Sequence, residues 1–195
     1  MSTHSSIHST RSLLKVGLVG NILESYEFSV YTFLVPIIGQ LFLQVSDPRT
    51  LYVQSYLIFA ISFLARPFGS VFWGYYADRI GRGSSLKASL FAMSIPTTLI
   101  GLLPTYDQIG FLAPFCFLVL RFVQGFSKGG EYSISGCYIY EMAPKNQRSF
   151  LCGAVSASAA IGMLCGSLMA TVLFWLFDQN TLLSWAWRIP YLLGI

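Results

Sequence analysis

Five ionisable side chains interrupt two long apolar stretches of this 195-residue sequence. They lie in the stretches at residues 16–43 and 109–137 and are Glu24, Glu27, Arg121, Lys128 and Glu131. A carboxylate in apolar surroundings can bind and release a proton as those surroundings change, because burial favours its neutral form and a nearby cation favours its charged form. A cationic side chain in the same place can bind an anion. Residues of these types can therefore exchange a proton or bind a charged small molecule.

Polar residues in each of these two stretches share one face of the expected helix. In the stretch at 109–137, the spacing i, i+3, i+4, i+7 and i+11 joins Gln124, Ser127, Lys128, Glu131 and Ser135. In the stretch at 16–43, one face carries Asn21, Glu24, Ser25 and Thr32. The two polar faces predict a shared interior that is lined by these side chains.

Embedded charges of this kind must be compensated. Each costs about 2.5–3.5 kcal/mol at the centre of a membrane helix, so we expect ion pairs or a water-filled cavity. At about 1.5 Å per residue from the centre of each stretch, Glu24 and Lys128 lie at the same depth, roughly 8 Å to the cytoplasmic side. We therefore predict that Glu24 and Lys128 pair across a cavity. A buried ion pair that only holds two helices together is an equally weighted alternative.

The composition excludes several classes of protein. Hydrophobic residues make up 54% of the chain and charged residues only 10%, whereas soluble domains carry about 25% charged residues. A disordered chain, a basic nucleic-acid-binding domain and an ordinary soluble enzyme are therefore excluded. The net charge of +4 is too small to indicate a polyanionic partner. A polytopic membrane protein surrounded by lipid is the class that fits.

Five stretches have the length of about 20 mostly apolar residues that a membrane-spanning helix needs. We expect an exposed cytoplasmic tail at residues 1–15, followed by spans at 16–43, 51–76, 84–103, 109–137 and 150–177. A sixth span begins near Trp187, but the sequence stops at Ile195. Eight or nine residues cover less than half of a hydrocarbon core about 30 Å thick. The predicted fold is thus an all-α integral membrane bundle with five transmembrane helices and an incomplete sixth, from a fragment or a truncated product.

Basic residues set the expected orientation. Seven of them fall at one set of span ends: Arg11, Lys15, Arg79, Arg82, Lys87, Lys145 and Arg148. Two, Arg49 and Arg188, fall at the other set. Because cytoplasmic loops carry the excess of Lys and Arg, the amino-terminus is predicted to be cytoplasmic.

Small residues recur every four positions in two of the stretches. One stripe contains Ala154, Ser158, Gly162, Gly166 and Ala170, and a second contains Gly125, Gly129, Ser133 and Cys137. Small residues let helix backbones approach closely in lipid, so we interpret both stripes as packing surfaces. No nucleophile–base pair or metal-ligand cluster is evident, so neither an enzyme active site nor a cofactor or metal site is expected.

The loop between the second and third stretches combines glycines with charges. It contains Gly74, Asp78, Arg79, Gly81 and Arg82. Glycines permit a tight turn between two spans, and a carboxylate at a helix end can accept bonds from the backbone amides of another helix. A plain basic cytoplasmic loop is the alternative interpretation.

At these residues the chain resembles the major facilitator superfamily. The loop at 74–82 resembles the signature G-x-x-x-D-R-x-G-R, and Gly83 departs from the basic residue that usually follows. Four other stretches resemble the metabolite:proton symporter family, which includes proline/betaine, oxoglutarate, citrate and shikimate carriers. The stretch at 20–28 resembles G-N-x-L-E-W-Y-D-F, with Ser25 in place of Trp and Glu27 in place of Asp. The others lie at 66–69 (R-P-x-G), 121–148 and 187–190.

The resemblance implies a transporter in the inner membrane that couples uptake of a small metabolite to protons. In such folds two six-helix halves rock around a midplane site, and this chain would be the N-terminal half. The central cavity would be lined by Asn21, Glu24, Glu27, Arg121, Gln124 and Glu131. The cytoplasmic gate would consist of Gly74, Asp78, Arg79, Gly81 and Arg82. Lys128 is not expected in this pattern; it either alters the charge preference for the substrate or marks relaxed constraint.

Several alternatives stay open at this point. The coupled proton could be carried by Glu24, Glu27 or Glu131. Cationic side chains suit a carboxylate substrate and acidic ones suit an amine, so a zwitterion such as proline or betaine is slightly preferred. The expected partners are lipid, the substrate, the proton and a missing C-terminal half, which could be a separate chain. A non-transporting remnant or an assembly partner of another carrier is the competing function.

Overall fold

The computed structural model describes the backbone of residues 3–43, 45, 47–130, 134–137, 140 and 147–194, and within these ranges the side chains from residue 17 onward. Five long helices dominate it: α1 (Thr3–Phe42), α2 (Pro48–Ile80), α3 (Arg82–Leu102), α5 (Leu112–Lys128) and α7 (Arg148–Leu176). Four short helices complete it: α4 (Tyr106–Ile109), α8 (Gln179–Ser184), the 3-10 helix η1 (Ala186–Arg188) and α9 (Ile189–Leu193). The described part contains no strand, so the predicted all-α class is confirmed.

Each predicted stretch overlaps a long helix, but the bounds differ at the amino-terminus and in the fourth stretch, where α5 covers only Leu112–Lys128. α1 begins at Thr3, so the backbone of the predicted tail belongs to the first helix. Helical backbone resumes at residues 134–137 beyond α5, inside the predicted fourth stretch. Glu131, a predicted cavity residue, lies outside the described residues. Among the described helices, three are long and apolar enough to cross a membrane: α2, α3 and α7.

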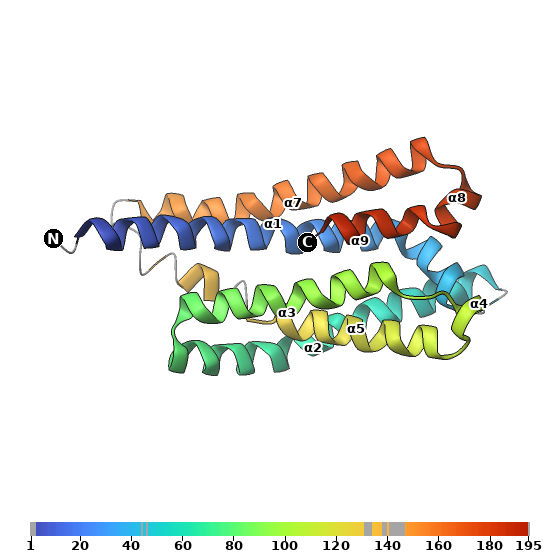
Figure 1. The fold of residues 1–195 in the computed structure, drawn as a ribbon, viewed down its shortest axis with the longest axis horizontal. Coiled ribbons are helices and arrows are strands. Elements are labelled where there is room, and N and C mark those ends of the chain that lie inside the picture. The colour runs from blue at the N-terminus through green and yellow to red at the C-terminus, as the bar shows by residue number, and fades with distance from the viewer. Residues whose placement is uncertain are drawn as a thin grey trace.

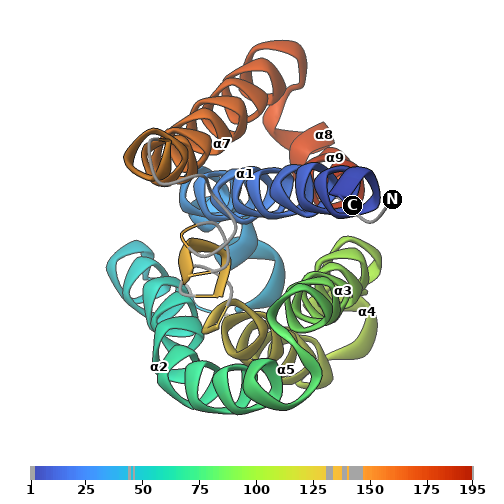
Figure 2. The same ribbon diagram turned by 90° about the vertical axis from the view of Figure 1, so that its left-hand side faces the viewer.

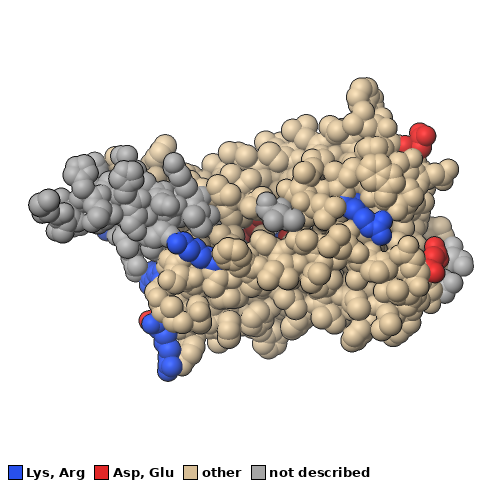
Figure 3. All heavy atoms as spheres, viewed as in Figure 1, with Lys and Arg blue, Asp and Glu red and all other residues tan. Residues whose placement is uncertain are grey.

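The long helices run along one axis and form two groups. Figures 1 and 2 show α1, α7 and α9 on one side and α2, α3 and α5 on the other. Within these groups α1 packs on α7, and α5 packs on both α2 and α3. Large apolar side chains such as Val71, Phe91 and Leu164 are exposed on the outside. Figure 3 shows a mostly uncharged face, with several basic side chains near the amino-terminal end and another basic group toward the opposite end.

Local sequence signals set both ends of α2. Asp47 caps the start of the helix, because its Oδ2 accepts bonds from the Thr50 amide at 3.0 Å and the Thr50 hydroxyl at 2.6 Å. Pro48 occupies the first turn, where its missing N–H costs nothing. The helix ends at Gly81, whose φ of 99° is a left-handed conformation that favours glycine. The glycine predicted to permit the turn into the third stretch therefore does so.

Glycines on α5 bring that helix close to α2. A Cβ atom on Gly125 would collide with the carbonyl oxygen of Ser62, and one on Gly129 would collide with that of Arg66. The hydroxyl of Ser62 donates to the carbonyl of Arg121 at 3.1 Å across the same contact. This close packing confirms the predicted role of the two glycines and fixes Arg121 relative to α2.

The small residues of α7 pack against α1 in the same way. A Cβ atom on Gly162 would collide with the carbonyl oxygen of Ile22, and one on Gly166 would come too close to that of Tyr26. The predicted packing stripe on α7 is therefore confirmed at these positions, and it positions the segment of α1 that carries the two glutamates.

Candidate functional site

Glu27 lies between two cations at the centre of the bundle. Its Oε2 is 3.2 Å from Nζ of Lys128, and its Oε1 is 3.7 Å from Nη1 of Arg121. Gln124 also donates a hydrogen bond to Oε1. The two cations are seven residues apart on α5, which places them on one helix face two turns apart. All four side chains are buried.

Arg121, on α5, contacts side chains of α5, α1 and α9. Its Nη1 donates to Oε1 of Gln124 and its Nη2 donates to the hydroxyl of Tyr191, both at 3.1 Å. The guanidinium carbon lies 3.8 Å from the ring centroid of Tyr31, a cation–π contact. Gln124 in turn donates to the hydroxyl of Thr97 at 2.9 Å. We call these seven residues the Glu27 cluster: Glu27, Tyr31, Thr97, Arg121, Gln124, Lys128 and Tyr191.

The Glu27 cluster contains two cationic side chains, Arg121 and Lys128, and one acidic side chain, Glu27. Buried charges are tolerated when they are paired, and Glu27 pairs with both Arg121 and Lys128. Within the described part of the chain, Oε2 of Glu27 and Nε of Arg121 are buried without a hydrogen-bond partner. The expectation that embedded charges would be compensated is therefore confirmed for Glu27, Arg121 and Lys128. Such a cluster can hold a buried carboxylate in place and can change its charge when the carboxylate takes up a proton.

The predicted pairing of Glu24 with Lys128 is wrong. Glu24 instead lies 3.5 Å from Nη2 of Arg66 on α2, and Lys128 pairs with Glu27. The prediction used depth along the helix alone, and depth does not fix the direction in which a side chain points. Three residues rotate a helix by about 300°, so Glu24 and Glu27 point about 60° apart, one toward α2 and the other toward α5.

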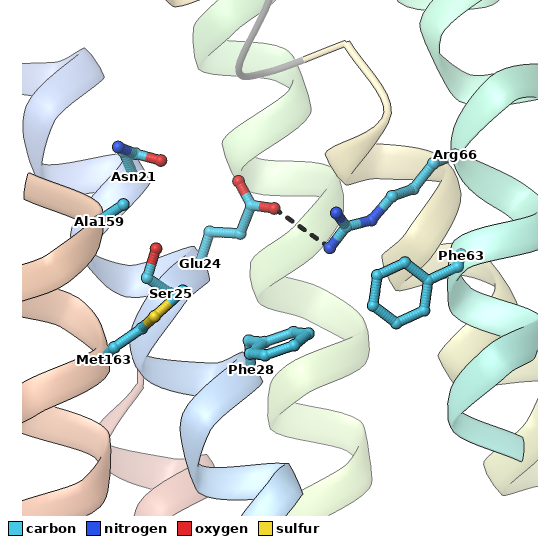
Figure 4. Close-up of a pocket in the computed structure, with 8 residues that line it drawn as sticks. All are labelled: Asn21, Glu24, Ser25, Phe28, Phe63, Arg66, Ala159 and Met163. Carbon is cyan, nitrogen blue, oxygen red and sulfur yellow. Dashed lines mark hydrogen bonds and ion pairs between the residues drawn. The ribbon is translucent and has the colours of Figure 1, made fainter. Parts of the chain in front are cut away.

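A pocket of about 280 Å³ opens beside the pair of Glu24 and Arg66. It lies between α1, α2 and α7 and is lined by Asn21, Glu24, Ser25, Phe28, Phe63, Arg66, Ala159 and Met163. In Figure 4, Glu24 and Arg66 point toward each other, and Phe28 and Phe63 lie to one side of them. We call this the Glu24 pocket.

Asn21, another predicted cavity residue, has a mainly structural set of contacts. Its amide nitrogen donates to the carbonyl of Val155 at 2.6 Å and to the hydroxyl of Ser158 at 2.9 Å, both on α7. It is 4% exposed, so only a small part of it reaches the Glu24 pocket. Asn21 therefore ties α1 to α7 at the wall of that pocket.

Reasoning from the sequence missed several residues of the two sites. They include Tyr31, Thr97 and Tyr191 of the Glu27 cluster and Phe28, Phe63 and Arg66 of the Glu24 pocket. Tyr31 lies one helical turn beyond Glu27, a spacing that could have indicated a shared face. Arg66 is a charged residue inside the second apolar stretch, which could have marked it as a partner for a glutamate. Thr97 and Tyr191 carry no charge and lie far along the chain, and no sequence signal marks them.

Three of the five predicted gate residues come together at the end of α2. Gly74, Asp78 and Arg82 line a pocket of about 170 Å³ with Ala77, Ile134 and Cys137. Arg79 points elsewhere, with its guanidinium carbon 4.6 Å from the ring centroid of Tyr75. Gly81 provides the turn between α2 and α3. The gate assignment itself stays a prediction.

A profile described as "Sugar (and other) transporter" matches residues 14–195. The chain belongs to this family of the major facilitator superfamily. The family relationship and the fold are those of transporters, not enzymes. Among solved structures, the E. coli proton:xylose symporter XylE superposes with a TM-score of 0.77 at 21% identity, covering 95% of this chain and 43% of that one. At this identity the likeness establishes the fold alone.

Relatives of this chain include solute transporters of bacteria. The chain is 33% identical to the glycine betaine/proline/ectoine/pipecolic acid transporter OusA of Dickeya dadantii, over 95% of this chain and 37% of that protein. It is 36% identical to the inner membrane metabolite transport protein YhjE of Escherichia coli, over 97% and 43%. It is 32% identical to the E. coli proline/betaine transporter, over 95% and 37%. The chain thus spans about two fifths of the length of these relatives, in their N-terminal half.

Proposed function

We propose that this chain is the N-terminal half of a proton-coupled transporter that takes up a small zwitterionic metabolite by alternating access. Its five long helices would each cross the inner membrane, with the amino-terminus in the cytoplasm. Family membership and the names of the relatives support transport of such a solute. The excess of basic residues at one set of helix ends supports the orientation. A C-terminal half, in the same polypeptide or in a separate chain, would complete the site.

The position of Glu27 carries the proposal. This carboxylate is sealed in the bundle with a cation against each of its oxygens, while both cations stand on a different helix. A movement of α5 relative to α1 would separate Glu27 from Arg121 and Lys128. A proton would then take the place of these cations as the partner of the carboxylate, because an uncompensated buried charge is costly. Glu27 would thereby couple helix movement to proton binding.

The cytoplasmic gate fits the same scheme. Asp78 and Arg82 lie at the end of α2 and the start of α3, next to the helical segment at 134–137. In the proposed orientation these residues are at the cytoplasmic end of the bundle. There they would form and break contacts as the two halves rock.

Uptake into proteoliposomes tests the proposal. The protein at its natural full length is reconstituted, and radiolabelled glycine betaine or proline is added with and without an imposed proton gradient. We expect accumulation above the external concentration only with an inward proton gradient, and loss of this accumulation on addition of a protonophore. Accumulation that is indifferent to the proton gradient would contradict proton coupling. Complete absence of solute uptake would favour the non-transporting alternative.

A further inference from the structure

We infer that the Glu24 pocket is a zwitterion-binding site, in which Arg66 binds a carboxylate while Glu24, Phe28 and Phe63 bind a quaternary or secondary ammonium group. The inference rests on the proposed function and deepens it, because it assigns the substrate to one ion pair of α1 and the proton to the other. Arg66 thereby becomes a specificity-determining residue.

The two ion pairs of α1 differ in accessibility. The side chains of Glu24 and Arg66 are 12% and 35% exposed, whereas those of Glu27 and Arg121 are 4% and 3% exposed. The contact of Glu24 with Arg66 is 3.5 Å, at the outer limit of a hydrogen bond. A small solute can therefore reach this pair and separate it, while the Glu27 cluster stays closed.

Arg66 retains hydrogen-bonding capacity for a ligand. A guanidinium has five N–H donors, and within the described part of the chain Nη2 of Arg66 donates to Glu24. The side chain is 35% exposed, and Figure 4 shows the guanidinium directed into the pocket toward Glu24. Adjacent N–H groups of an arginine bind a carboxylate through two parallel bonds, so the terminal nitrogens of Arg66 can bind a ligand carboxylate.

The aromatic rings beside the pair of Glu24 and Arg66 suit a cation. The guanidinium carbon of Arg66 lies 4.6 Å from the ring centroid of Phe63, so this ring already has a positive charge on its face. A ligand ammonium would take that place when Arg66 turns toward the ligand carboxylate. Phe28 stands edge-to-face with Phe63 at a centroid distance of 6.0 Å. Aromatic faces beside a carboxylate bind ammonium groups that carry alkyl substituents.

Charge balance selects a zwitterion over a simple anion or cation. A zwitterion replaces the pair of Glu24 and Arg66 with two new pairs and leaves no charge uncompensated. An anion would leave Glu24 unpaired, and a cation would leave Arg66 unpaired, each at a cost in a low-dielectric site. A volume of about 280 Å³ lies just below the roughly 300–1,000 Å³ of sites for drug-sized ligands, which fits a small solute.

Three probes of nearly equal shape test the contribution of each ligand charge by itself. Glycine betaine carries both; 3,3-dimethylbutyrate replaces its quaternary nitrogen with carbon; choline lacks the carboxylate. Dissociation constants are measured on the protein at its natural full length, in detergent, by displacement of radiolabelled glycine betaine. The variants are Glu24→Gln, Arg66→Gln and their charge-neutral double variant, with Arg49→Gln as a matched control on an exposed part of α2.

We expect the unaltered protein and Arg49→Gln to prefer glycine betaine by about tenfold or more over either analogue, the effect of about 1.4 kcal/mol. Arg66→Gln is expected to lose the preference over choline but to keep that over 3,3-dimethylbutyrate. Glu24→Gln is expected to do the reverse. The double variant, which leaves no unpaired charge, is expected to fold and to lose both preferences.

Equal loss of affinity for all three probes in both single variants would indicate a structural pair and overturn the inference. Unchanged preferences would overturn it too, as would an absence of betaine and proline binding to a protein that accumulates another solute. The expected preferences in a protein without proton-driven accumulation would refute the proposed function and support this binding site. The two proposals therefore fail by different measurements.

Discussion

The ammonium group of Lys128 lies 3.2 Å from Oε2 of Glu27, and both side chains are less than a tenth exposed. Lys128 was the one pathway residue that the family pattern did not predict. Its contact with Glu27 gives it a definite place: it neutralises the oxygen that Arg121 does not face. The Glu27 cluster thus holds its carboxylate from two sides, by residues two turns apart on one helix.

Removal of Glu27 should destabilise the protein more than removal of Lys128. Glu27→Gln leaves two buried cations, Arg121 and Lys128, without the carboxylate that pairs with them, and breaking a buried ion pair costs about 3–5 kcal/mol. Lys128→Met leaves Glu27 paired with Arg121, so we expect a loss of about 3 kcal/mol or less. Unfolding in detergent measures both effects, and a Glu27→Gln protein as stable as Lys128→Met would contradict the pairing.

Close packing of α5 on α2 should be sensitive to a single methyl group. Gly125→Ala places a Cβ atom against the carbonyl oxygen of Ser62, and overpacking of this kind costs about 1–3 kcal/mol. The melting temperature in detergent should fall accordingly. Gly153→Ala on α7, where a Cβ atom meets nothing within 4 Å, is the matched control. We expect it to be neutral or slightly stabilising, since Ala favours helix. Equal melting temperatures of the two variants would argue against the contact.

The cap at the start of α2 should make stability depend on pH. The hydroxyl of Thr50, and then its backbone amide, donate to the Asp47 carboxylate and hold its pKa below the ordinary value of 3.8. Because the folded-state pKa is lower than that of the unfolded chain, the contribution is complete above pH 3.8 and is lost as the pH falls through the folded-state value. We therefore expect Asp47→Ala to melt at a lower temperature than the unaltered protein at pH 7.

Melting curves at pH 7 and in the acidic range below the ordinary pKa of Asp47 check this prediction. The gap between the unaltered protein and Asp47→Ala should narrow in acid. Asp47→Asn is the control, because Asn caps helices about as well as Asp but does not titrate. A gap to Asp47→Ala that keeps its full size in acid would show that the carboxylate charge is not responsible.

Much of the fold was predictable from the sequence, because long apolar runs end at charged or turn-forming residues. The predicted stretches at 51–76, 84–103 and 150–177 correspond to α2, α3 and α7. Glycine spacing predicted that α7 and α5 each carry a close-packing surface, since close helix contacts need small residues at every fourth position. The partner helices, α1 and α2, were not predicted. Short helices such as α8 lack a strong periodic pattern and were not predicted.

The site was predictable in its members but not in its pairing. Glu27, Arg121, Gln124 and Lys128 were identified because charged and amide groups are rare in apolar helices, and the structure brings all four together. The partner of Glu24 was mistaken because helical rise gives depth, whereas the choice between α2 and α5 depends on the rotation of α1 within the bundle. That rotation is fixed by packing against α7, which is a tertiary contact.

Exchange and accumulation by the Glu27→Gln protein test most directly whether this carboxylate carries the coupled proton. Proteoliposomes with the protein at its natural full length are assayed for exchange of glycine betaine in both directions and for accumulation under an inward proton gradient. We predict that Glu27→Gln retains exchange but loses accumulation, because a neutral amide permits helix movement without binding a proton. Accumulation by Glu27→Gln equal to that of the unaltered protein would contradict the account.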